Sequence, residues 1–149
     1  MLGALRQRTS QLGLADRVHY LGLASGAAKL WLLSAAVCLC QPSRSEGFSL
    51  SILEAMASSR PVIISDRCKF PSVMELGAGI VVPMTISDIA AGLRVYASDP
   101  VRRLADGRAA RRLIERCYTW EIVSKQADQM YAQTVAQVPY GSAKPGQRP

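Results

Sequence analysis

The chain has 149 residues, 49% of them hydrophobic and 19% charged, which is the balance of a globular protein and excludes a disordered or collagen-like chain. Its longest apolar run, Leu30–Cys40, has about half of the ~20 residues that a membrane-spanning helix needs, and no signal-peptide core is visible. We therefore expect a cytoplasmic protein. The formal net charge of +7 favours anionic partners such as nucleotides or a membrane surface.

Strand-like and helical stretches alternate from the N-terminus as far as Val82, and this alternation predicts an α/β fold with a mostly parallel sheet. Gly13 is expected to end a helix and Gly22 a strand. The predicted elements, in chain order, are helix Leu2–Leu12, strand Val18–Leu21, helix Ala27–Ser34, strand Val37–Cys40, helix Ser49–Ser58, strand Pro61–Ser65, helix Ser72–Leu76 and strand Gly79–Val82.

Beyond Pro83 the pattern predicts helices only. Thr85, Asp99 and Thr119 are expected to begin three successive helices, because their side-chain oxygens can accept hydrogen bonds from first-turn amides. We expect all three helices to pack over the sheet. Segment 139–149 is rich in Pro, Gly and basic residues and is predicted to be disordered, which leaves residues 1–138 as one domain.

The loop of residues 41–47 links a predicted strand to a predicted helix. Open α/β sheets bind ligands at such loops, where backbone amides and the helix dipole favour anions. Gly47 lets the backbone approach a ligand closely, and the amides of Phe48, Ser49 and Leu50 are the expected free donors of the first helical turn. This arrangement suits a diphosphate.

Two carboxylates flank the start of the same helix. Glu46 lies just before it and Glu54 lies about a turn inside it, and ionised carboxylates are acceptors suited to pairs of sugar hydroxyls. The alternative is structural, because acidic side chains near a helix N-terminus stabilise its dipole and Glu54 shares a polar stripe with Ser51 and Ser58. The spacing alone leaves both interpretations open.

The string E-G-F-S-L-S-I-L-E-A-M-A from Glu46, followed by P-V-I-I-S from Pro61, resembles the donor-binding signature of retaining GT-B glycosyltransferases of the glycosyl transferases group 1 type. The resemblance extends over roughly Leu2 to Gln137. It implies a Rossmann-like parallel sheet with flanking helices, the C-terminal half of a GT-B fold. It also implies a hexosyltransferase-like activity in which a nucleoside-diphosphate sugar is the donor substrate, without a metal or other cofactor.

The resemblance assigns roles to individual residues. Glu46 is implied as the catalytic residue and would contact hydroxyls of the transferred sugar, while Glu54 would bind the nucleotide ribose. The backbone around Gly47, Phe48, Ser49 and Leu50 would hold sugar and diphosphate. The nucleotide base is expected near the glycine turn of Leu21, Gly22 and Leu23.

The chain departs from the family pattern in two places. Ser59-Arg60 stands where the family commonly has a glycine before the proline. In addition, the acceptor domain and the first strand of the sheet, with the basic residues that follow it, are not found in these residues. We expect a partner chain or an upstream segment to supply them. A non-catalytic subunit of the same fold, acting through a partner chain, stays open as an alternative.

Six arginines lie between Arg102 and Arg116, where only Asp106 and Glu115 oppose them. The run is interpreted as a solvated helix face, with peripheral contact to anionic lipid at the inner face of the membrane as the alternative. Nucleic-acid binding is not expected, because the tryptophans are not interleaved with basic residues.

Overall fold

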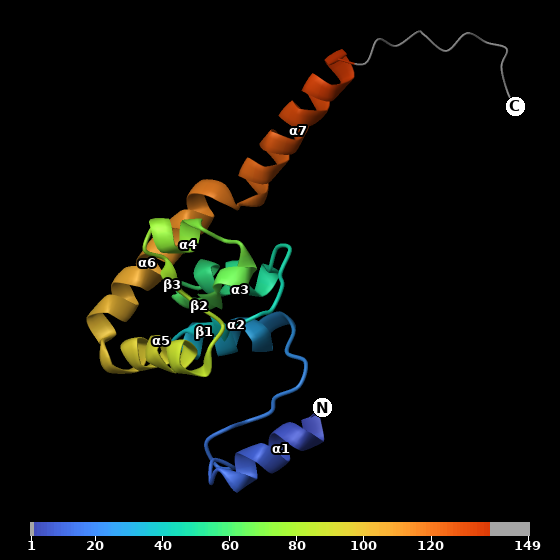
Figure 1. Cartoon of the computed structure of the whole chain (residues 1–149). Coiled ribbons are helices and arrows are strands. Elements are labelled where there is room, and N and C mark those ends of the chain that lie inside the picture. Colours follow the sequence, from blue (N-terminus) through green and yellow to red (C-terminus); the bar gives the residue numbers. More distant parts are fainter. Residues whose placement is uncertain (1, 138–149) are drawn as a thin grey trace, which may run out of the picture. The chain divides into compact units, whose positions relative to one another are not determined.

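The structure is a computed structural model that describes residues 2–137 (Figure 1). The chain divides into two compact units, residues 1–32 and residues 33–149. The tail predicted to be disordered, 139–149, lies outside the described residues. None of the helices in the described part of the chain is long and apolar enough to cross a membrane.

The first unit contains α1 (Leu2–Gln11) and most of α2 (Gly26–Ala35). Gly13, with φ +65°, follows the end of α1 as predicted, and Gly22 also has a positive φ of +69°. The strand predicted at Val18–Leu21 is wrong, because these residues form no strand. A strand is defined by pairing with a neighbour, and no described segment pairs with this one. The hydroxyls of Thr9 and Tyr20 are hydrogen-bonded instead.

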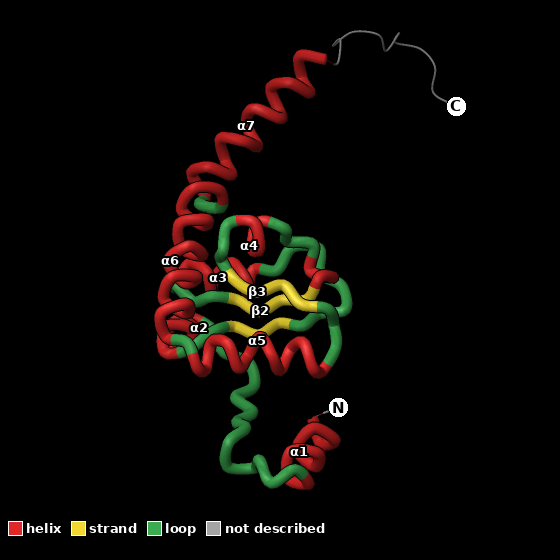
Figure 2. The backbone as a smooth tube through the Cα atoms, turned by 60° about the vertical axis from the view of Figure 1, so that its left-hand side comes forward, coloured by secondary structure: helices red, strands yellow, loops and turns green. Residues whose placement is uncertain are grey.

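The second unit is built on a parallel sheet in the order β1 (Leu39–Gln41), β2 (Val62–Ser65), β3 (Gly79–Val82). The sheet lies between helices (Figure 2). The short 3₁₀ turn η1 (Asp66–Cys68) follows β2. The helices of this unit are α3 (Leu50–Ala57), α4 (Ser72–Glu75), α5 (Ile86–Ser98), α6 (Pro100–Cys117) and α7 (Trp120–Gln137).

Strand β2 is the centre of the core, and all four of its residues are buried. Because successive strand side chains point to opposite faces, Val62 and Ile64 join the cluster formed with α3, α4 and α6, whereas Ile63 packs with Tyr96 of α5 on the other face. The predicted α/β class and the parallel sheet are therefore confirmed, and both faces of the sheet are covered.

The predicted caps of all three C-terminal helices are present, and at the start of α7 the amide of Ile122 donates to Thr119 Oγ1 at 3.4 Å. Thr85 accepts a hydrogen bond from the amide of Asp88 at 3.1 Å, and Asp99 accepts one from the amide of Arg102 at 2.8 Å. Helix α5 consequently begins at Ile86, and α6 begins at Pro100, where a proline has no amide hydrogen to leave unsatisfied.

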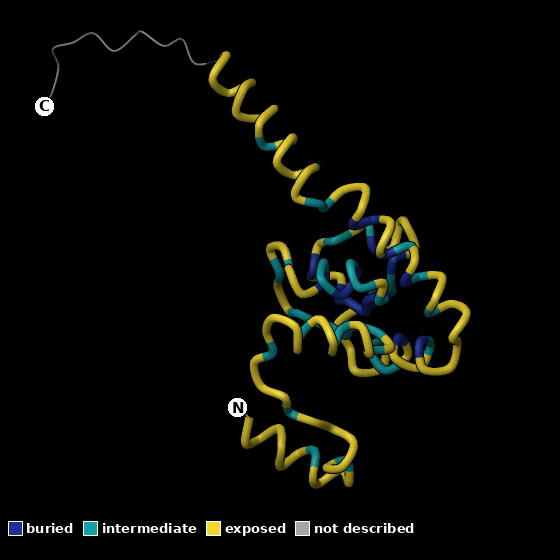
Figure 3. The backbone as a smooth tube through the Cα atoms, turned by 180° about the vertical axis from the view of Figure 1, so that it is seen from behind, coloured by how far each residue is buried: buried dark blue, intermediate teal, exposed yellow. Residues whose placement is uncertain are grey.

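Helix α7 corrects the expectation that all three C-terminal helices pack over the sheet. Of its side chains from 120 to 136, only Ile122 and Ala127 are even half-buried, and Figure 3 shows the helix exposed along nearly its whole length. Trp120 at its start is 88% exposed. The physical reason is that α3, α4, α6 and α5 already cover both faces of the sheet.

Candidate functional site

The loop after β1 leads into α3, which begins at Leu50, one residue later than predicted. Ser49 takes the N-cap position in extended conformation, but its hydroxyl does not cap the helix. It is hydrogen-bonded to the side-chain amide of Gln41 at 2.9 Å instead. The first-turn amides of Leu50, Ser51 and Ile52 therefore have no intrahelical acceptor and no side-chain cap. Of the predicted first-turn donors only Leu50 lies in this turn, because Phe48 and Ser49 precede the helix.

Glu46 is half-buried and is fixed by two donors. Its Oε1 atom accepts hydrogen bonds from Gln41 Nε2 and from Ser43 Oγ, each at 2.8 Å. No described residue donates to its second oxygen, Oε2. The carboxylate is thus held on one side, while its other side keeps acceptor capacity.

The loop that carries Glu46 is tied to the neighbouring strand. Ser65, the buried last residue of β2, donates from its hydroxyl to the carbonyl oxygen of Ser43. Because β1 and β2 are parallel and in register at Gln41 and Ile64, their carboxyl ends meet at this point. The fold therefore positions Glu46 through contacts at the ends of two strands.

Sequence reasoning missed Gln41, Ser43 and Ser65 as site residues. A signal was present, since Gln41 and Ser65 are polar residues at the carboxyl ends of apolar strands. Side chains at these ends of a parallel sheet lie at its ligand-binding edge.

Glu54 lies in a different set of contacts. It is half-buried and lines a groove of about 590 Å³ between α3 and the start of α7. Phe48 and Leu50 share this groove, whereas Glu46 and Ser49 do not line it. The other lining residues are Leu53, Ala57, Cys117, Tyr118, Trp120, Val123 and Gln126.

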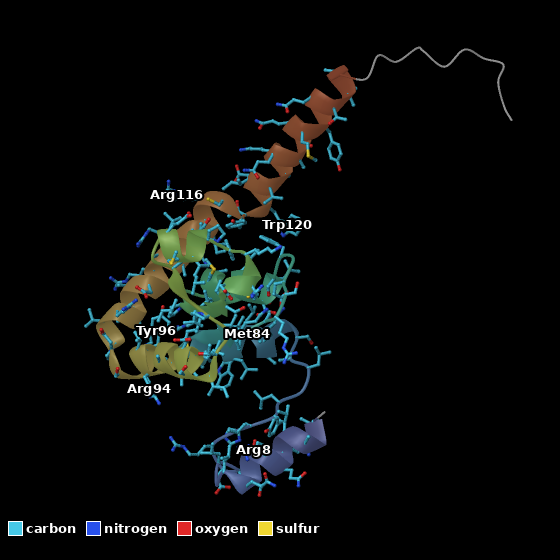
Figure 4. All side chains as sticks on the ribbon, in the orientation of Figure 1. Arg8, Met84, Arg94, Tyr96, Arg116 and Trp120 are labelled. Atoms are coloured by element: carbon cyan, nitrogen blue, oxygen red, sulfur yellow. The ribbon has the colours of Figure 1, made fainter. Side chains whose placement is uncertain are left out.

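Phe48 belongs to an aromatic cluster with Phe70 and Tyr118. The ring centroids are 5.7 Å apart for Phe48 and Tyr118 and 5.6 Å apart for Phe70 and Tyr118, the latter pair edge to face. Burial, and secondarily Cys117, raises the pKa of the Tyr118 hydroxyl. The cluster joins the loop before α3 to the segment between α6 and α7, and Trp120 lies beside it at the start of α7 (Figure 4).

The departure at Ser59-Arg60 has a local structural role. Ser59, the residue after the C-cap of α3, adopts φ +56°. Its amide donates to Met56 O at 3.0 Å, and the Arg60 amide donates to Ala55 O at 2.9 Å. This is the Schellman ending, for which glycine is the usual residue. The Arg60 guanidinium donates to Ala36 O at 3.2 Å.

The glycine turn of Leu21, Gly22 and Leu23 is exposed. Leu21 lines a hollow of about 460 Å³ within the first unit, together with Arg6, Thr9 and Tyr20. The base-proximal role of these three residues stays a prediction. Within residues 2–137, no group of three or more His, Cys, Asp or Glu is placed to hold a metal ion.

The sequence model of the family described as "Glycosyl transferases group 1" matches residues 3–119. Among curated proteins, the chain is 33% identical over 141 residues to an MMP alpha-(1->4)-mannosyltransferase of Mycolicibacterium hassiacum, and the match covers 91% of this chain and 34% of that protein. It is 41% identical over 80 residues to the O-antigen chain mannosyltransferase RfbU of Salmonella typhimurium, and that match covers 54% of this chain and 23% of RfbU. The chain thus spans about a third or less of these relatives.

Solved structures give the same result. A sucrose-phosphate synthase from Thermosynechococcus elongatus superposes with a TM-score of 0.78 at 27% identity, covering 90% of this chain and 34% of that one. The C-terminal domain of a glycosyl transferase group 1 family protein, LpcC, from Francisella tularensis superposes with a TM-score of 0.69 at 27% identity. The superposition covers 79% of this chain and 62% of the LpcC chain. The predicted Rossmann-like half of a GT-B fold is confirmed.

Proposed function

Because the chain belongs to the glycosyl transferases group 1 family, we propose that it binds the nucleoside-diphosphate sugar donor of a retaining glycosyl transfer. The observation that carries the proposal is the fixed carboxylate of Glu46, held by Gln41 and Ser43 at 2.8 Å. It lies in the loop that leads into the uncapped N-terminus of α3. The free amides of α3 are suited to the diphosphate of such a substrate, and the carboxylate of Glu46 is suited to the hydroxyls of its sugar.

The N-terminus of α3 would bind the diphosphate of the donor. The first-turn amides of α3 and the positive end of its dipole favour an anion, and the Ser49 hydroxyl does not occupy those amides. Gly47 has open space where a side chain would begin, so the backbone leaves room for the phosphates beside it.

The sugar is the part that Glu46 would receive. Its Oε2 atom is oriented by the bonds to Oε1 and would accept hydrogen bonds from sugar hydroxyls. Glu54, in the groove beside α3, would bind the ribose hydroxyls. Since the two relatives named above are mannosyltransferases, the donor that we propose first is a nucleoside-diphosphate mannose.

In the transfer itself, the bond between sugar C1 and the diphosphate oxygen breaks and the electron pair leaves with the diphosphate. An acceptor hydroxyl forms the new bond to C1, and its proton passes to the leaving diphosphate. Positive groups and amides stabilise the charge that develops on the leaving group. The acceptor and its binding domain would come from an upstream segment or a partner chain, since the chain spans only about a third of its relatives.

Calorimetric titration of the protein with guanosine- and uridine-diphosphate mannose tests the donor site. We expect saturable binding to one of them, weakened at least about tenfold by Glu54→Ala and by Glu46→Gln, as loss of a hydrogen bond to a charged group implies. Glu121→Ala is the matched control, because Glu121 is exposed and pairs only with Lys125 at 2.9 Å. Absence of binding, or equal binding by all variants, overturns the proposal.

The second candidate is a non-catalytic subunit that acts through a partner chain. Strand β1 pairs with β2 on one side only, and no described residue pairs with its other edge, where another strand could add. A cooperative melt of the purified chain, with no change when a candidate partner is added, would contradict this alternative. A broad melt that sharpens on addition would support it.

A further inference from the structure

Helix α6 carries three arginines in one exposed row. Arg108, Arg112 and Arg116 follow each other at intervals of four residues, so they lie on one side of the helix, and all three are exposed. No acidic side chain of the described residues pairs with them. The remaining arginines of the helix are engaged: Arg102 with Asp106 at 3.5 Å, Arg111 with Glu115 at 2.7 Å, and Arg103 with Tyr96 O at 3.1 Å.

Apolar side chains are interspersed with this row. Arg112 and Arg116 line a hollow of about 240 Å³ with Leu76, which directly follows α4, and with Ala109, Leu113 and Cys117 of α6. Leu76 is more than half exposed. One to two turns before Arg108, Val101 and Leu104 are also more than half exposed. Arg116 lies at the α4 end of the helix (Figure 4).

We propose that this surface, made of the three arginines with Val101, Leu104 and Leu76, binds the face of an anionic phospholipid bilayer. Guanidinium groups bind phosphate oxygens through two parallel hydrogen bonds, and apolar side chains among them enter the boundary between headgroups and acyl chains. Acidic groups nearby do not neutralise the row, since Asp106 and Glu115 are already paired and Glu75 of α4 makes no ion pair within the described residues.

A nucleic acid would offer phosphates too, but the composition of the surface favours lipid. Leucine and valine have no partner on a phosphate–sugar backbone, and the row has no aromatic side chain on which a base can stack. The proposal is independent of the donor site, because none of its residues lines the groove of Glu54 or contacts Glu46.

Vesicle co-sedimentation at about physiological salt tests the proposal, with phosphatidylcholine vesicles compared with vesicles containing about 30% phosphatidylglycerol. The triple variant R108Q/R112Q/R116Q is compared with R8Q/R17Q/R94Q, whose three arginines are also exposed and whose change in net charge is the same. Each arginine near an anionic surface contributes roughly fivefold to the partition coefficient. We therefore expect the partition coefficient to fall about 100-fold in the α6 triple variant and less than about threefold in the control variant.

A second pair of measurements separates bilayer binding from simple attraction to phosphate. Val101→Ser with Leu104→Ser keeps the charge and is expected to reduce binding to anionic vesicles several-fold. Millimolar glycerol phosphate is expected not to compete.

Circular dichroism checks the fold. If the triple variant does not fold, the single variants R112Q and R116Q should each show a partition coefficient about fivefold lower. Equal losses in the α6 triple and its control, competition by glycerol phosphate, or tighter binding to an RNA oligonucleotide would overturn the proposal.

Discussion

Gln41 Nε2 lies 2.8 Å from Glu46 Oε1, so the last residue of β1 holds the carboxylate of the loop that leads into α3. The same side-chain amide contacts the hydroxyl of Ser49 at 2.9 Å. One glutamine therefore connects the sheet, the loop and the start of α3.

Gln41→Leu should weaken donor binding without unfolding the protein, because it removes a donor to a charged group. Such hydrogen bonds contribute about 1.5–3 kcal/mol, which corresponds to roughly a tenfold to hundredfold loss of affinity. The readout specific to positioning is a comparison of ligands. The mannose donor should lose affinity, whereas the nucleoside diphosphate without sugar should keep it, since Glu46 is proposed to contact the sugar.

Ser124→Ala is the control for that change, because Ser124 is exposed on α7 and bonds only locally to Glu121 O at 3.2 Å. If Gln41→Leu weakens both ligands equally, Gln41 supports the helix start through Ser49 and not the orientation of Glu46.

Ser59→Gly should stabilise the protein. A left-handed backbone costs an L-residue roughly 1–2 kcal/mol, and Ser59 adopts it at φ +56°. Glycine removes that strain but adds freedom to the unfolded chain, so a net gain of about 0.5–1 kcal/mol is expected in urea unfolding. The neighbouring Ser58→Gly is the matched control and should give no gain, since Ser58 has φ −86°.

Gly79→Ala should destabilise the sheet severely. A Cβ there would fall inside contact distance of the Val62 carbonyl oxygen and 2.8 Å from Val62 Cγ2, and neither strand can move away without breaking the β2–β3 ladder. A loss of about 3 kcal/mol or more is expected. Gly3→Ala, with nothing within 4 Å, should be neutral or slightly stabilising, and a comparable loss there would contradict the steric explanation.

Tyr96 should make stability fall at high pH. Burial, and secondly its hydrogen bond to Asp106 at 2.8 Å, raises the pKa of Tyr96 above its ordinary value. The folded state therefore keeps the phenol neutral while the unfolded chain ionises above pH about 10. The contribution is fully present below pH about 10 and is lost as the pH rises beyond it.

Tyr96→Phe isolates this effect. At neutral pH the variant should be about 1–2 kcal/mol less stable, because Asp106 loses a donor. Above pH 10 its stability should decline less steeply than that of the parent. Parallel curves for the two proteins between about pH 8 and 11, measured by chemical unfolding, would exclude Tyr96 as the titrating group.

Local patterns predicted the second unit well. Gly79–Val82 coincides with β3, and Thr85 and Asp99 begin their helices as their side-chain chemistry indicates. These elements depend on neighbouring residues or on strong apolar runs. The strand at Val18–Leu21 was wrong because a strand needs a pairing partner, which no local pattern reveals.

The rest of the site depends on contacts between distant residues. Gln41 and Ser65 are 24 positions apart in the sequence, and both act on the loop of Glu46 only because β1 and β2 are parallel neighbours. Helix α7 was misplaced for a related reason. Its apolar residues resemble a packing face, and only the completed core shows that both faces of the sheet are already occupied.

Cys117 is a suitable labelling site for observing both the proposed donor site and the proposed membrane-binding surface. It is the exposed thiol among the four cysteines, all of which lie in the described chain, whereas Cys68 is buried and burial raises the pKa of Cys38 and Cys40. It also lines both the groove of Glu54 and the hollow beside Arg112 and Arg116. A maleimide fluorophore should therefore attach there selectively near neutral pH, and one labelled position would report optically on donor and on vesicles.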